Sequence, residues 1–140
     1  MIKLEKIKEL LITGKLLSSD TFSNIDINDL LDKRDNDDFS DEWIRVYNEI
    51  SKNRGLTSLD EDEIIKSIRE KSYKTTYNAS KSPELAGYIS DDFGLIADAI
   101  ILNFSDEWLN ALAKEYIDGR IPHNKLKHLK GDLEMILLNY

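Results

Sequence analysis

Two histidines are the side chains in this sequence that first invite a metal-site or catalytic interpretation. His123 and His128 lie five positions apart, so they do not share one helix face as a zinc-binding pair at i and i+4 does. A solvated, partly basic tail explains both better than a metal site. Cysteine is absent, which removes thiolate zinc ligands and cysteine nucleophiles. We therefore expect no metal and no cofactor.

A first group of carboxylates, Asp35, Asp37 and Asp38, superficially resembles a calcium-binding loop. The glycine and the later bidentate glutamate of such a loop are not at their positions, and Phe39 occupies one of them. What remains informative is the charge around this group. Between residues 26 and 42 eight carboxylates face only two basic residues, Lys33 and Arg34. A negative patch of this kind steers a basic partner, although a solvated loop explains it equally well.

A second group, Asp91 and Asp92 followed by Asp98, has the residue types of an acid–base or metal site. Asp91 and Asp92 are equally well explained as acids in the first turn of a helix. No His-Glu-x-x-His motif, phosphate-binding loop or nucleotide-binding glycine pattern accompanies them. We expect a protein that is not an enzyme, and a carboxylate-site enzyme around Asp91 and Asp92 is the alternative.

The composition is that of an ordered globular domain, with 140 residues, 41% hydrophobic and 33% charged. The net charge of −8 disfavours nucleic-acid binding and favours a basic partner, although acidity for solubility alone is as good an explanation. Apolar stretches are broken by charge or too short to cross a bilayer. Together with the absence of cysteine, this predicts a cytoplasmic protein without membrane contact.

Apolar residues recur at helical spacing along the whole chain, and no segment alternates with period two, so we predict an all-α, single-domain, multi-helix bundle over residues 1–140. Residues of the types that cap helices precede several of the predicted helices. The predicted helices span residues 4–11, 26–31, 40–52, 58–73, a short one from 82, 90–102, 105–118 and 123–140.

The sequence Phe-Ser-Asp-Glu-Trp occurs at residues 39–43 and again at 104–108. This repeat predicts a degenerate helix-turn-helix duplication, with units at about 26–55 and 91–120. Trp43 and Trp108 then stand at matching positions in the first turn of a helix, beside a hydrophobic staple. We favour core packing for both rings over a shared binding surface.

Three segments, at residues 84–93, 106–109 and 116–122, resemble small bacterial immunity proteins of polymorphic toxin and contact-dependent growth inhibition systems. The resemblance implies an inhibitor made beside its cognate toxin, which it binds in the cytoplasm without a cofactor. A regulator or adaptor from a mobile element remains an alternative. The predicted partner-binding residues are Asp35, Asp37, Asp38, Asp91, Asp92 and Tyr88, and an aromatic surface around Tyr88 and Phe93 is the alternative to the acidic one.

Overall fold

A computed structural model describes residues 2–55 and 57–138, and these residues form seven α-helices and one 3-10 turn, without a strand. The predicted all-α class is therefore confirmed. None of the described helices is long and apolar enough to cross a membrane. The elements are α1 (Ile2–Ile12), η1 (Ser19–Phe22), α2 (Ile27–Arg34), α3 (Asp37–Asn53), α4 (Leu59–Ser80), α5 (Pro83–Ile101), α6 (Glu107–Ile117) and α7 (Leu133–Leu138).

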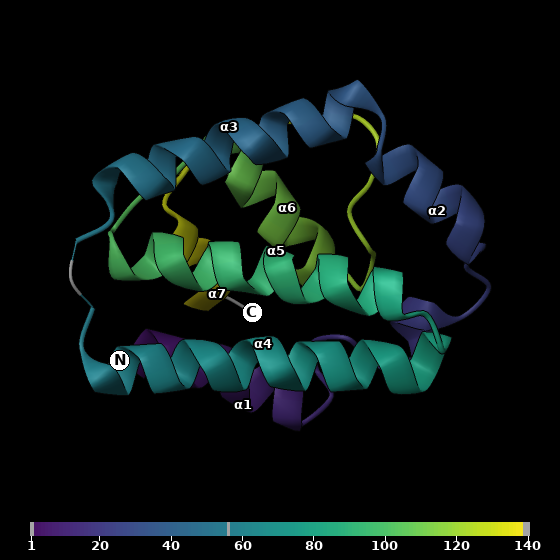
Figure 1. Ribbon diagram of the computed structural model, residues 1–140, viewed down its shortest axis with the longest axis horizontal. Coiled ribbons are helices and arrows are strands. Elements are labelled where there is room, and N and C mark those ends of the chain that lie inside the picture. The colour runs from purple at the N-terminus through teal and green to yellow at the C-terminus, as the bar shows by residue number, and fades with distance from the viewer. Residues whose placement is uncertain (1, 56, 139–140) are drawn as a thin grey trace.

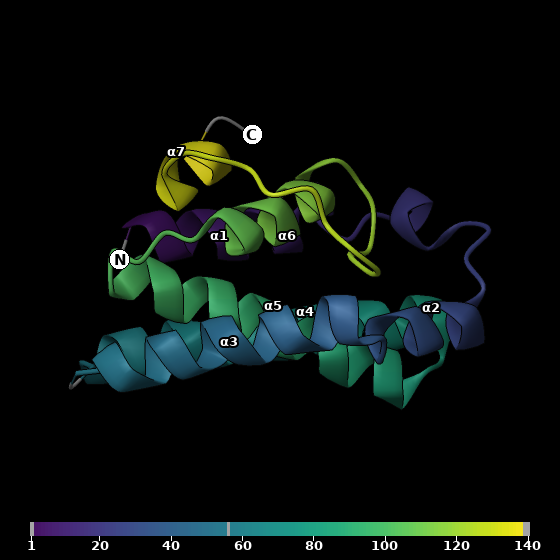
Figure 2. The ribbon, with the colours of Figure 1, turned by 90° about the horizontal axis from the view of Figure 1, so that it is seen from above.

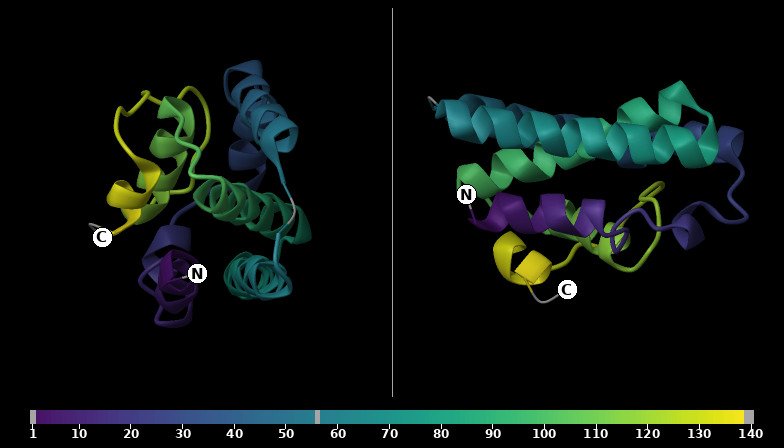
Figure 3. Two further views of the ribbon diagram at one scale, coloured as in Figure 1. Left: turned by 90° about the vertical axis from the view of Figure 1, so that its left-hand side faces the viewer. Right: turned by 90° about the horizontal axis from the view of Figure 1, so that it is seen from below.

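The helices pack in two layers around α5. In one layer α4 and α5 run antiparallel, and α3 lies on the other side of α5 with α2 beyond its first turn (Figure 1). The second layer contains α1, α6 and α7 (Figures 2 and 3). Because α5 has neighbours in both layers, nearly every residue from 92 to 100 is buried. The most apolar segment of the chain is therefore the centre of the bundle.

Short-range capping explains three helix starts that the sequence predicts. Asp26 caps α2 by accepting a backbone N–H of its first turn. Ser58 and Glu61 form the reciprocal capping box of α4, and Ser82 caps α5 with Pro83 in its first turn. Each of these bonds satisfies a backbone N–H that the helix itself leaves without a partner.

Helices α4 and α5 are both longer than the sequence predicts. Helix α4 continues to Ser80 instead of ending near residue 73, and its Ser72 and Thr76 are buried. Helix α5 passes through Ser90, where we predicted a separate start. The Ser90 hydroxyl donates to the backbone carbonyl of Arg69 at 2.9 Å. These small polar side chains therefore lie within the packed structure, although we predicted Thr76 outside a helix and Ser90 at a helix start.

The tail has no regular secondary structure before α7, so over the described residues 123–138 the predicted helix is wrong except for α7, and residues 139 and 140 lie outside the described part of the chain. The Asn110 side-chain amide donates to the carbonyls of Leu129 and Gly131, at 3.0 and 2.8 Å. The Leu129 N–H donates in turn to the carbonyl of Glu107 at 3.0 Å. These bonds hold the irregular segment before α7 against α6 and take the place of the bonds within a helix.

The internal duplication is not confirmed, because the two copies of the repeated sequence occupy different places in their helices. Helix α3 begins at Asp37 with Asn36 as its cap, instead of at Ser40, whereas Asp106 of the second copy is itself the cap of α6. Trp108 is in the core as predicted, edge-on to the Phe39 ring at 5.3 Å. Trp43 is only partly buried, so the prediction of core packing holds for one ring and not fully for the other.

Candidate functional site

A buried carboxylate, Asp92 of α5, is the point at which four helices meet. Arg34 of α2 donates to both its oxygens, at 3.0 and 2.8 Å. The Trp43 indole N–H of α3 donates at 2.9 Å, and the Tyr116 hydroxyl of α6 at 2.5 Å. Arg34 also donates to the carbonyl of Pro122 at 2.9 Å. The network therefore fixes α2, α3, α6 and the segment after α6 relative to α5.

The charge states in this network follow from its contacts. Burial alone would lower the pKa of Arg34, but the adjacent Asp92 carboxylate more than compensates and the pKa is raised, so the guanidinium stays charged. Burial and the same carboxylate raise the pKa of Tyr116 well above its ordinary value, so its hydroxyl stays a donor. Asp92 is thus saturated with hydrogen bonds from charged and neutral donors.

Asp92, which we predicted as a partner-binding residue, is 0% exposed, so its side chain is not part of the surface that this structure presents. Arg34 is buried beside it. Residues 91 and 92 are adjacent, but consecutive helical positions point about 100° apart. Asp91 consequently points toward the surface, while Asp92 points into the bundle. Which of the two is buried depends on where the neighbouring helices pack on α5.

The carboxylates of α5 do not form a paired acid–base site. Asp91 pairs with Arg69 of α4 at 2.6 Å, and Asp98 pairs with Arg54, the residue after α3. Burial raises the pKa of Asp98, with both arginines opposing the effect. Asp91 and Asp98 are thus each paired with a different arginine from outside α5, and not with each other. Among the described residues no group of three or more histidines and carboxylates has the arrangement to hold a metal ion.

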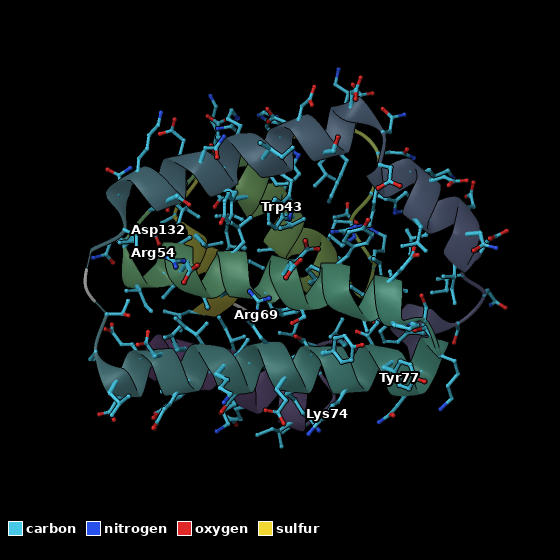
Figure 4. The ribbon with its side chains drawn as sticks, viewed as in Figure 1. Trp43, Arg54, Arg69, Lys74, Tyr77 and Asp132 are labelled. Atoms are coloured by element: carbon cyan, nitrogen blue, oxygen red, sulfur yellow. The ribbon has the colours of Figure 1, made fainter. Side chains whose placement is uncertain are left out.

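A hollow of about 170 Å³ opens above the buried network, between α3 and α5. We call it the aromatic hollow, after the rings of Phe39, Trp43 and Tyr88 in its wall. The rest of the wall consists of Ser40, Ile44 and the charged residues Arg34, Asp35 and Asp91. Ile44 is 53% exposed and Tyr88 38%. A second hollow of about 280 Å³ adjoins it and shares Trp43 and Asp91. In Figure 4, Trp43 lies between α3 and α5, and Arg69 lies between α5 and α4.

Beside the hollow, the α2–α3 junction carries the acidic edge, which comprises Asp35, Asp37 and Asp38. All three are exposed, and no ion pair to them is found within the described residues. The basic residues next to them have other partners, since Lys33 pairs with Asp29 at 2.8 Å and Arg34 with Asp92. The negative charge of this edge is therefore not compensated by its sequence neighbours.

Arg34, Trp43 and Tyr116 were not predicted as members of one site, because long stretches of chain separate them and they match no motif. Phe93, predicted as part of an aromatic surface, is 2% exposed and packs against the Tyr116 ring, with ring centroids 4.8 Å apart. Of that predicted surface only Tyr88 is accessible.

These features define a small all-α domain in which a rigid buried network supports exposed aromatic and acidic side chains. The family model for Immunity protein PIM1 matches residues 6–123. The chain therefore belongs to the Immunity protein PIM1 family, which confirms the resemblance to bacterial immunity proteins. The matched region includes all the residues of the buried network and the acidic edge. No curated protein matches the sequence.

Proposed function

We propose that this protein neutralises a cognate bacterial toxin by binding it, and that the toxin presents a basic surface to the acidic edge. The observation that carries the proposal is membership of an immunity protein family over residues 6–123. The mechanism is inhibition by occupancy: the bound protein covers the toxin's active site or a surface beside it. This mechanism requires no cofactor and no catalysis by the immunity protein.

The charge distribution supports a basic partner. The chain carries a net charge of −8, and the acidic edge concentrates uncompensated carboxylates at one helix junction. Such a patch raises the rate at which a protein of opposite charge associates. Rapid association is what an inhibitor needs, because it must capture the toxin before the toxin acts. The same charge repels nucleic acid.

The alternative of a carboxylate-site enzyme gains no support from the geometry. Asp92 has no exposure to a substrate and Asp91 is paired with Arg69. A general base must reach the proton that it removes. Asp92 lies too deep for that, so no specific observation favours catalysis at this position.

Co-expression with the cognate toxin domain, which we expect to be encoded beside this chain's gene, tests the proposal. Cells producing that domain should grow when this protein is present and fail to grow without it, and the purified proteins should form a stoichiometric complex. A matched control is an unrelated toxin domain, against which no protection is expected. If the neighbouring toxin is neither bound nor neutralised, the proposed function is wrong.

A further inference from the structure

We propose that the aromatic hollow receives an arginine side chain of the toxin, with Asp35 as the counter-ion of its guanidinium. This inference rests on the proposed function, because it assigns the place where the toxin is anchored. Asp35 belongs to both the hollow and the acidic edge. The hollow would determine how long the complex lasts, whereas Asp37 and Asp38, the edge residues outside it, would determine how fast the complex forms.

The residues around the hollow are those of an interface anchor. Ile44, Tyr47 and Tyr88 are 53%, 50% and 38% exposed, and Trp43 is partly exposed beside them. Exposed apolar groups that gather in one place on a protein surface commonly mark an interaction site. Tryptophan and tyrosine are also enriched among the residues that contribute most to binding energy.

The hollow is pre-organised, so little freedom is lost when a partner enters. The Trp43 indole is held by its hydrogen bond to Asp92 at 2.9 Å and by stacking on Tyr47, with ring centroids 5.6 Å apart. Below it, Phe39 is packed against the buried Arg34 guanidinium at 4.4 Å. Rigid side chains avoid the ordering cost that flexible ones incur on binding.

The charges around the hollow favour a cation. The positive charge of Arg34 is neutralised by its ion pair with Asp92, and the negative charge of Asp91 by its ion pair with Arg69. Asp35 has no ion-pair partner within the described residues, which leaves the hollow net negative. Tyr88 also responds to this negative charge. Its pKa is raised by burial first and then by the charges of Asp35 and Glu84, and the charge of Arg34 lowers it.

Size and shape indicate arginine. At about 170 Å³ the hollow is smaller than the pockets that hold drug-sized ligands, roughly 300 Å³ and above, so it suits one side chain. A guanidinium is planar, stacks on aromatic faces and is more weakly hydrated than the lysine ammonium. The buried Arg34 guanidinium already lies 4.4 Å from the Phe39 ring centroid and 5.6 Å from that of Tyr88, so a second guanidinium would contact the exposed parts of Tyr88 and Trp43.

Binding kinetics with the neighbouring toxin domain separate the hollow from the acidic edge. Asp35→Asn should accelerate dissociation about tenfold, whereas Asp38→Asn, an equally exposed carboxylate outside the hollow, should alter mainly the association rate. Ile44→Ala should likewise accelerate dissociation, about tenfold. Its matched control is Leu59→Ala, which removes an even more exposed apolar side chain at the start of α4. Equal dissociation rates for the test and control variants would overturn the inference.

A double-mutant cycle identifies the partner side chain. Each surface arginine and lysine of the toxin is changed to Ala and measured against wild-type protein and Asp35→Asn. One arginine should show a loss of affinity that largely disappears in the Asp35→Asn background. If a lysine couples instead, or no residue does, the hollow does not receive an arginine.

A third measurement follows Trp43 itself, with Trp43→Phe used only to assign its resonance. Protein labelled with 5-fluorotryptophan should give two ¹⁹F resonances, one for each tryptophan, assigned with Trp43→Phe. Binding of unlabelled toxin should shift the Trp43 resonance and reduce its solvent exposure, and leave the buried Trp108 nearly unchanged. An unchanged Trp43 resonance in a formed complex overturns only the hollow. Failure of the wild-type protein to bind at all overturns the proposed function and the hollow together.

Discussion

Arg34 and Asp92 lie 58 residues apart in the chain and form a buried ion pair through two hydrogen bonds. Removing two charges from water is costly, so a buried pair often contributes little net stability relative to an apolar replacement. Its loss is nevertheless expensive, because the remaining charge stays buried without a partner. This pair also joins the last turn of α2 to the middle of α5 and thereby fixes the floor of the aromatic hollow.

Replacement of the buried carboxylate should severely destabilise the fold. Asp92→Asn leaves the Arg34 guanidinium without its counter-ion, and we expect a loss of about 3–5 kcal/mol in the free energy of unfolding. Urea denaturation followed by circular dichroism measures it. Asp91→Asn is the matched control, because its pair with Arg69 is exposed and should contribute less than about 1 kcal/mol. Similar small losses in both variants would contradict the role given to Asp92.

The two tryptophans should differ in their contribution to stability. Trp108 is 1% exposed and lies in the core, so Trp108→Ala should cost about 3–5 kcal/mol. Trp43→Ala removes a half-buried ring and one hydrogen bond to Asp92, and we expect a loss of about 1–2 kcal/mol. Thermal and urea unfolding of the two variants tests the difference. Equal losses would show that Trp43 is a core residue after all.

The cap of α6 should make stability depend on pH in the acid range. Burial alone would raise the pKa of Asp106, but hydrogen bonds from Arg45 and from the backbone N–H groups of Leu109 and Trp108 outweigh it and lower the pKa below 3.8. The charged carboxylate therefore stabilises the fold above about pH 3.8, and this contribution is lost as the pH falls through the lowered pKa.

Asp106→Ala should accordingly cost about 1–2 kcal/mol near neutral pH. The difference from wild type should shrink as the pH falls below about 3.8, where the wild-type carboxylate becomes protonated too. Urea titrations at a series of pH values measure it. A difference that stays constant down to pH 2 would contradict this account of the cap.

The acidic edge should act on association with the toxin. Asp37→Asn combined with Asp38→Asn removes two exposed charges outside the hollow, so association should slow and depend less on salt. Stopped-flow mixing at several ionic strengths gives both quantities. Both residues lie in the first turn of α3, where each negative charge contributes about 0.3–1 kcal/mol, so the fold should persist. Unchanged association would exclude the acidic edge as the steering surface.

Much of the fold could be predicted because its signals are local. The caps at Asp26, Ser58 and Ser82 bond to backbone groups three residues away, and the apolar spacing within each helix identifies its buried face. The exposure of the acidic edge also followed from local polarity. Thr76 and Ser90 are polar residues buried against other helices. Because local polarity alone does not reveal such burial, we predicted Thr76 outside a helix and a helix start at Ser90, and both predictions are wrong.

By itself, the sequence determined an acidic, all-helical domain without the motifs of the commonest catalytic sites, and it indicated the immunity family. Only the tertiary structure decided which of the neighbouring residues Asp91 and Asp92 faces solvent, and that Arg34 leaves the charged surface for the core. The physical reason is that helix spacing specifies which residues share a face, but not which faces meet. The meeting of α2, α3 and α6 on α5 brings Arg34, Trp43 and Tyr116 to one carboxylate, and no local pattern encodes that.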